Sequence, residues 1–164
     1  MRYAPAAVAL SLVAAITASA GMSADRQPDP RAAALVSEGK SQLAAGQADA
    51  ATDSLEAALA IDPGYTAVYL ALGDVARSQG LQGKAIRYYR EALARDPKNL
   101  AAISGEGKAM VEKGAVEKAK RNLAELQSLC GTSCGEAQQL AMAIQNHPVL
   151  TADAAVPPAG VTHN

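Results

Sequence analysis

The chain has 164 residues, a formal net charge of -1 and 49% hydrophobic residues, with no Trp and no Phe. This length suits one domain. The balanced charge argues against a nucleic-acid-binding protein, which usually carries a strong basic excess. Of all residues 39 are Ala, which favours helices in close contact over a β-sandwich. The composition therefore predicts a compact, all-α protein.

The N-terminus has the pattern of an export signal. Arg2 precedes an uncharged run from Ala4 to Ala18, and the small residues Ala18 and Ala20 flank Ser19. Such a pattern is typical of a secretory signal peptide, and the run is shorter than the about 20 residues that span a bilayer. We expect a signal peptide over 1–20, a flexible leader over 21–29 and an exported protein, either periplasmic or secreted. An uncleaved anchor helix is the alternative.

Five sets of residues recur at intervals of 34 along the rest of the chain. These sets are Gly39, Gly73 and Gly107; Gly46, Gly80 and Gly114; Ala51, Ala85 and Ala119; Leu55, Tyr89 and Leu123; and Ala58, Ala92 and Leu126. A period of 34 is typical of a helix-turn-helix repeat. The pattern predicts helices over 30–45, 48–61, 64–79, 82–95, 98–113, 115–130 and 134–146.

The corners between these helices follow from Gly and Pro. The set that begins with Gly46 is expected to end the first helix of each unit in the left-handed conformation. Asp62-Pro63 and Asp96-Pro97 should end the second helices, with each Asp capping the helix that follows. The set that begins with Gly39 lies inside helices, where we expect the backbone of a neighbouring helix to come close.

The last predicted helix is expected to cover the end of the array. Ser133 and Glu136 have the spacing of a capping box at its start, and a repeat array needs a terminal cap with a polar outer face. Residues 147–164 show no pattern and include several Pro residues, which predicts a disordered tail.

Cys130 and Cys134 are the only cysteines. Export would place them in an oxidising compartment, so we expect a disulfide that pins the last helix. A redox-active pair is the alternative, because a helix N-terminus favours a reactive thiolate. The CxxxC spacing is not the CxxC of the usual redox motif. No haem-attachment motif is present, and the ligands needed for a metal site are lacking.

The second unit resembles the tetratricopeptide repeat (TPR) most closely. It has the family's residues at Tyr69, Leu72, Gly73, Ala85, Tyr89, Ala92 and Pro97. The first unit matches at Leu35, Gly39, Ala51, Leu55, Ala58 and Pro63, with Glu38 in place of Leu. The third matches at Ile103, Gly107, Ala119 and Leu123, with Glu106 for Leu and Gly131 for Pro. The resemblance implies a right-handed α-solenoid over 30–146, with units at 30–63, 64–97 and 98–131 and a cap helix at 134–146.

The resemblance also implies a function. First helices of successive units line a concave groove in this family, so the repeat register gives the candidate partner groove as Val36, Lys40, Leu43, Leu70, Asp74, Arg77, Lys108 and Val111. Val36, Leu70 and Ser104 stand where some members clamp a C-terminal carboxylate, so we do not expect a receptor for chaperone tails. We expect a protein-interaction scaffold or assembly adaptor that binds a protein or peptide, without cofactor, metal or nucleic acid.

No catalytic motif is present, so the chain is not expected to be an enzyme. The alternative function is a thiol- or redox-linked accessory protein that uses Cys130 and Cys134.

Two helices carry opposite charges. Asp49, Asp53 and Glu56 make the helix at 48–61 acidic, whereas Lys84, Arg87, Arg90 and Arg95 make the helix at 82–95 basic. These charges are expected to act as surface electrostatics between stacked units. A patch for an anionic partner is the alternative.

Overall fold

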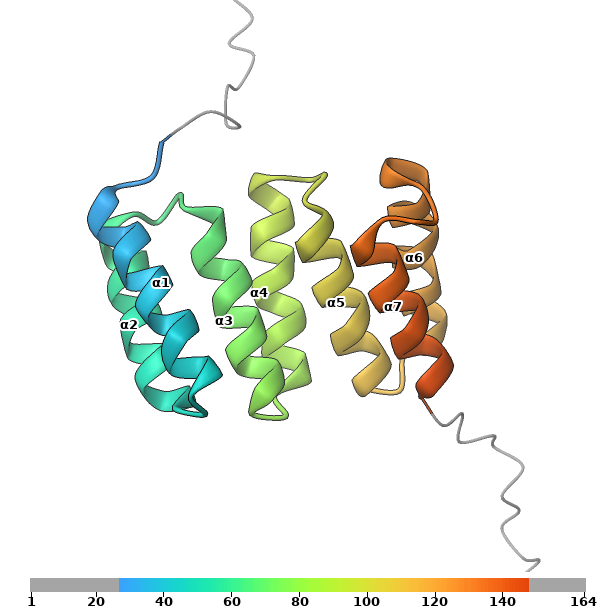
Figure 1. Ribbon diagram of the computed structural model, residues 1–164, viewed down its shortest axis with the longest axis horizontal. Helices are drawn as coiled ribbons and strands as arrows, with labels where there is room; N and C mark the ends of the chain where they lie inside the picture. Colours follow the sequence, from blue (N-terminus) through green and yellow to red (C-terminus); the bar gives the residue numbers. More distant parts are fainter. Residues whose placement is uncertain (1–26, 148–164) are drawn as a thin grey trace, which may run out of the picture.

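The computed structural model describes residues 27–147, which form seven α-helices and no strand (Figure 1). The helices are α1 (Pro30–Ala44), α2 (Ala48–Ile61), α3 (Thr66–Ser78), α4 (Gln82–Arg95), α5 (Leu100–Glu112), α6 (Val116–Cys130) and α7 (Gly135–Asn146). None of these helices has the length and apolar character needed to cross a membrane. The predicted signal peptide, most of the leader and nearly all of the predicted tail lie outside the described residues.

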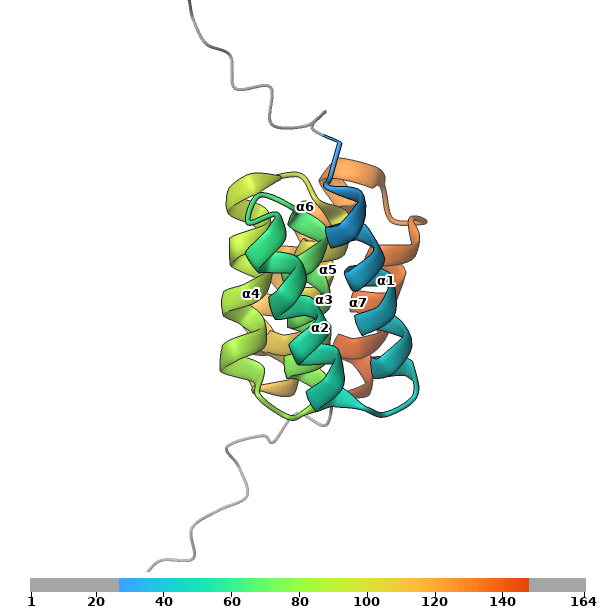
Figure 2. The ribbon, with the colours of Figure 1, turned by 90° about the vertical axis from the view of Figure 1, so that its left-hand side faces the viewer.

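The helices stack as an α-solenoid, as the period predicts. Each helix packs against the next one along the chain, and α1, α3, α5 and α7 also contact one another in series. The even helices α2, α4 and α6 contact odd helices but not each other within the described part of the chain. The odd helices thus form a continuous layer, with the even helices spaced along its other side (Figure 2).

Glycine ends the first helix of each unit, as predicted. Gly46, Gly80 and Gly114 have φ angles of 77°, 73° and 83°, which a residue with a Cβ rarely adopts. The turn at the first of them is closed by the N–H of Gln47, which donates to the carbonyl of Gln42 at 2.9 Å. This bond satisfies one of the carbonyl groups left free at a helix end.

The Asp-Pro corners differ from the prediction. Asp62 and Asp96 are the C-caps of α2 and α4, and each opens a turn in which its carbonyl accepts the N–H of Tyr65 or Asn99. Pro63 suits the second position of such a turn because its φ is already fixed. The odd helices α3 and α5 therefore begin two residues later than expected, and Asp62 and Asp96 do not cap them.

The buried side chain of Asp62 accepts hydrogen bonds from the backbone instead. Its side chain is only 2% exposed, and its carboxylate oxygens accept the N–H of Gly64 and of Asp29, each at 3.2 Å. Asp29 itself caps α1 by accepting the N–H of Arg31 at 2.9 Å. The start of α1 is in this way tied to the corner between α2 and α3.

Large side chains fill most of the space beside the glycines inside the odd helices. A Cβ on Gly39 would lie 2.8 Å from Leu55, and one on Gly73 would lie 2.6 Å from the ring of Tyr89. The expectation of a close backbone holds at Gly39, where a Cβ would also lie 3.2 Å from the carbonyl oxygen of Ala51, whereas the nearest atoms at Gly73 belong to a side chain. Gly39 and Gly73 each make room for the bulky residue of an even helix, which compensates for the low helix propensity of glycine.

Unit three accommodates its unusual Glu106 with polar partners. The residue is 7% exposed. One carboxylate oxygen accepts a hydrogen bond from Nε of Arg90 at 2.7 Å, and the other accepts one from the side-chain amide of Asn122 at 3.1 Å. A buried carboxylate is tolerated when it is paired in this way.

Helix α7 covers the end of unit three, as predicted. Its Leu140 is fully buried and occupies the space beside Gly107, where a Cβ would lie 2.6 Å from it. The hydroxyl of Ser104 on α5 donates to the carbonyl of Glu136 at 3.2 Å. The predicted capping box does not form, because the N-cap of α7 is Cys134 and it makes no side-chain capping bond. Ser133 lies one residue too early to take that role.

Candidate functional site

A pocket of about 160 Å³ opens between α3, α5 and α7, the odd helices of the array. Its lining combines apolar and charged side chains from these helices with one tyrosine from α4. The lining residues are Leu70, Asp74, Tyr89, Ala101, Ser104, Gly105, Lys108, Glu136 and Gln139. This volume is smaller than the about 300–1,000 Å³ of typical small-molecule sites, so the pocket suits a single side chain of a partner rather than a whole ligand.

Tyr89 reaches the pocket from the even helix α4 by passing between two odd helices. A Cβ on Gly73 of α3 would lie 2.6 Å from its ring, and one on Gly105 of α5 would lie 2.5 Å from it. The ring thus occupies a slot that only two glycines can provide. Its hydroxyl emerges at the pocket and donates to Asp74 at 2.7 Å. Burial, followed by the charge of Asp74, raises the pKa of Tyr89, so the phenol stays protonated.

Several charged side chains around the pocket have polar partners. Lys108 donates to the amide oxygen of Gln139 at 3.1 Å, and burial, together with the nearby charge of Arg77, lowers the pKa of Lys108. Arg77 forms an ion pair with Glu112 across α3 and α5 and lies 3.9 Å from Asp74. Burial alone would lower the pKa of Arg77, but its hydrogen bonds to Glu112 raise that pKa overall. Cations and carboxylates therefore alternate at this face.

The structure brings only part of the predicted groove together. Leu70, Asp74 and Lys108 line the pocket, and Arg77 stands beside it. Val36 and Val111 are 4% and 3% exposed and belong to the core.

The remaining two predicted residues lie on α1, away from the pocket. Leu43 packs against the core that the first unit shares with α3. Lys40 is exposed and does not line the pocket.

Sequence reasoning missed the residues that reach the pocket from outside the first helices of the three units. Tyr89 belongs to an even helix, and Glu136 and Gln139 belong to the cap. One signal was present: Gly105 stands 34 residues after Ala71, so it is an extra glycine outside the repeating sets. An extra glycine inside a helix indicates that a bulky neighbour needs its space.

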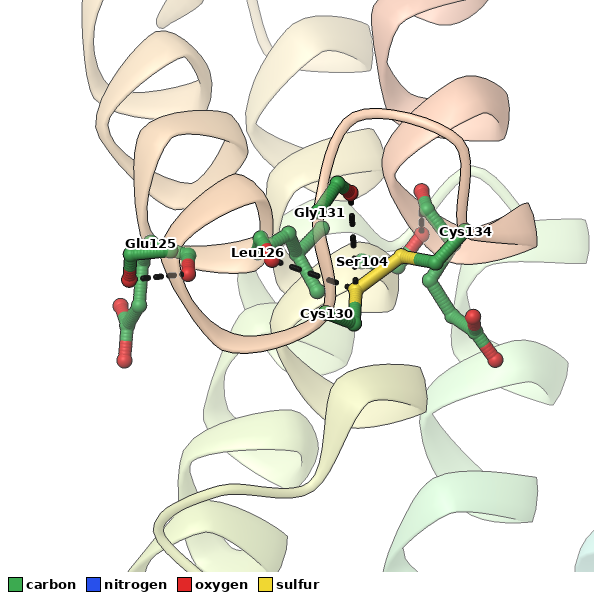
Figure 3. The surroundings of a disulfide bond; sticks show 8 residues. Ser104, Glu125, Leu126, Cys130, Gly131 and Cys134 are labelled. Atoms are coloured by element: carbon green, nitrogen blue, oxygen red, sulfur yellow. Dashed lines mark hydrogen bonds between the residues drawn. A yellow bond between two sulfur atoms is a disulfide. The ribbon is translucent and has the colours of Figure 1, made fainter.

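Cys130 and Cys134 meet at the corner between α6 and α7 (Figure 3). Their Cα atoms are 5.9 Å apart and their sulfur atoms lie at bonding distance. The Sγ of Cys130 is also 3.2 Å from the carbonyl oxygen of Leu126, one turn earlier in α6. Residues 27–147 contain no cluster of three or more His, Cys, Asp or Glu side chains that could hold a metal ion.

Known proteins resemble this chain in its repeat and in its overall fold. The family model for the tetratricopeptide repeat matches residues 66–99, which is the second unit. No curated protein matches the sequence.

Three solved structures share the arrangement. The Sgt2 TPR domain from Aspergillus fumigatus has a TM-score of 0.67 at 24% identity, over 84% of this chain and 91% of that one. The first TPR of Spaghetti (RPAP3), bound to the HSP90 peptide SRMEEVD, has a TM-score of 0.65 at 18% identity, over 73% and 97%. The first TPR domain of human RPAP3 has a TM-score of 0.63 at 19% identity, over 70% and 93%. Residues 66–99 therefore match the tetratricopeptide repeat, and the chain shares the fold of these TPR domains.

Proposed function

We propose that this protein is an exported interaction module, rather than an enzyme, that holds an extended peptide or a partner helix against its odd helices. The pocket between α3, α5 and α7 carries this proposal. Leu70 and Ala101 offer apolar surface to a side chain of the partner. Asp74, Lys108 and Glu136 offer charges of both signs beside it, a combination that orients a partner as well as holding it.

The bound segment is not expected to be a chaperone tail held by its terminal carboxylate. The solved Spaghetti domain holds the HSP90 peptide SRMEEVD, but the likeness to it is one of fold. In this chain Val36, Leu70 and Ser104 occupy the row from which such a clamp would come. Val36 and Ser104 are buried. An internal segment with mixed apolar and charged side chains fits the pocket better.

Site-specific photocrosslinking tests this function. A benzoylphenylalanine in place of Ala101, which is exposed at the pocket, should crosslink the full-length protein to a reproducible protein partner in its own cell. Ala57 on the even helix α2 is equally an exposed Ala in a helix, and the same probe there is the matched control. No reproducible product from position 101, or the same products from both positions, would contradict the proposal.

We also propose that the protein acts in the periplasm as a scaffold or assembly adaptor, and that a Cys130–Cys134 disulfide fastens its cap. The export signal in the sequence supports the location, and the 5.9 Å between the two Cα atoms supports the bond, since disulfides usually span about 5.5–6 Å. The pair closes only a small loop, so its contribution to stability should stay below the roughly 3 kcal/mol of a 15-residue loop.

The position of Cys134 at the N-cap of α7 favours one alternative, a thiol-linked accessory protein, because helix N-termini favour reactive thiolates.

Cys130→Ser separates the two roles of the cysteines. For a structural bond we expect a lower free energy of unfolding in denaturant, unchanged partner crosslinking, and no thiol-exchange activity in the wild-type protein to lose. Intact mass of the wild-type protein from its own cell should show a chain that begins at Gly21 and lacks two hydrogen atoms. A retained Met1 would refute cleavage of the signal peptide, and two free thiols would refute the disulfide. Exchange activity that disappears in the variant would support the redox role instead.

A further inference from the structure

The surface of the even helices changes sign between repeats at equivalent positions. Asp53 on α2 corresponds to Arg87 on α4 and Arg121 on α6, each 34 residues apart. One turn earlier, Ala50 corresponds to Lys84 and Lys118. Units two and three therefore share two cations at the same places on their second helices, where unit one has an acid and an alanine. We call Lys84, Arg87, Lys118 and Arg121 the cationic band.

All four side chains of the band are exposed. Within residues 27–147 none of them forms an ion pair, although other cations nearby do: Arg90 pairs with Glu106 and Lys120 with Glu117. Lys84 also contacts a ring, with its Nζ 5.7 Å from the centre of the Tyr88 ring. A partner can therefore contact the four cations of the band without breaking an ion pair within residues 27–147.

The band is narrow because acids border it at equivalent positions. Glu91 and Glu125 are also 34 residues apart and lie one turn beyond Arg87 and Arg121. Both are exposed. A flat anionic surface that approached the cations would meet this acidic row as well. An extended chain that crosses α4 and α6 along the two cationic rows would avoid it.

We infer that the cationic band is a second binding surface, which takes an extended acidic segment of a partner protein across α4 and α6. The two cations on each helix are three residues apart, about 4.5 Å along the axis. Side chains on one face of an extended peptide repeat every two residues, at about 6.6 Å. An acidic side chain that lies over either helix is therefore within reach of both cations of that helix, while the pocket on the odd helices stays free for its own partner.

The binding of a synthetic peptide of alternating Glu and Ser, followed by fluorescence anisotropy, tests this surface. We expect the full chain to bind the labelled peptide more weakly as salt rises. Arg87→Asp with Arg121→Asp should weaken binding about tenfold or more at low salt. Both substitutions install the type of residue that unit one already has at this position, so folding should be retained. Lys40→Glu with Lys98→Glu changes the net charge equally at exposed positions outside the band and should leave the affinity near that of the wild type.

A gain of binding gives an independent test. Ala50→Lys with Asp53→Arg extends the band onto α2 and should tighten binding of a longer peptide of the same composition. Absence of peptide binding by the wild type, equal losses in the band and control variants, or no gain in the extended variant would overturn the inference. Binding to vesicles of anionic lipid without binding to the peptide would overturn it in favour of a membrane surface. Salt-sensitive self-association that Asp53→Arg abolishes would overturn it in favour of a second copy of the chain.

Discussion

Gly105→Ala should lower the free energy of unfolding by about 1–3 kcal/mol, although Ala is the better helix former. The new Cβ would lie 2.5 Å from the ring of Tyr89. The ring has little room to move aside, because it also lies close to Gly73, where a Cβ would be 2.6 Å from it. Something in the core between α3, α4 and α5 must shift. Chemical denaturation, with the midpoint and slope compared to the wild type, measures the loss.

Gly83→Ala is the matched control, because it is the same substitution in a helix of the same array. A Cβ at Gly83 meets nothing within 4 Å, so this variant should gain up to about 1 kcal/mol from helix propensity. In a Tyr89→Leu background, with the residue type that Leu55 and Leu123 supply at this position, the cost of Gly105→Ala should largely disappear. Losses of the same size at Gly83 and Gly105, or no rescue by Leu, would contradict the account of the slot.

Leu140→Ala should cost about 2–5 kcal/mol and loosen the cap helix. Leu140 is fully buried, and it faces Gly107, which has no side chain to collapse into the space left behind. Since α7 rests on α5 and α6 alone, the loss should be local. Hydrogen exchange should rise in α7 before it rises in α3 and α4.

Met142→Ala is the control within the same helix. Its side chain is 53% exposed, so the change in stability should stay within about 0.5 kcal/mol. Gly107→Ala in the Leu140→Ala background should recover part of the loss, because its methyl group enters the vacated space. Equal effects at Leu140 and Met142 would show that α7 is not anchored through its leucine.

The repeat period predicted the even helices well and the odd helices less well, for a physical reason. The bounds of α2 and α4 agree with the prediction because a glycine turn precedes each helix and an Asp-Pro corner follows it. An Asp-Pro pair occurs both at the start of α1 and after α2. At Asp29 the side chain caps the start of α1, whereas Asp62 directly follows α2, so the backbone of Asp62 serves as the C-cap of that helix. Sequence alone does not separate these two uses of one dipeptide.

The binding face was harder to predict than the fold. Repeat register identifies which helices face the groove, and Leu70, Asp74 and Lys108 do line the pocket. It does not distinguish a groove position from the adjacent core position on the same helix, which is where Val36 and Val111 lie. Tyr89 could not be assigned by register at all, because its contribution depends on the absence of side chains at two glycines on other helices.

The slot around Tyr89 also limits how freely the repeats can be exchanged during evolution or in design. At the preceding joint the corresponding pair is Leu55 with Ala71, which share one core cluster; at the joint of Tyr89 it is tyrosine with Gly105. The combined size of the pair is thus kept at these two joints, although the size at each repeat position is not. A repeat moved as 66–99 would carry its tyrosine to a new neighbour without the glycine that receives it. The transplantable segment of this solenoid therefore extends from the start of α3 to Gly105, and substitutions at positions 89 and 105 should be inherited as a pair.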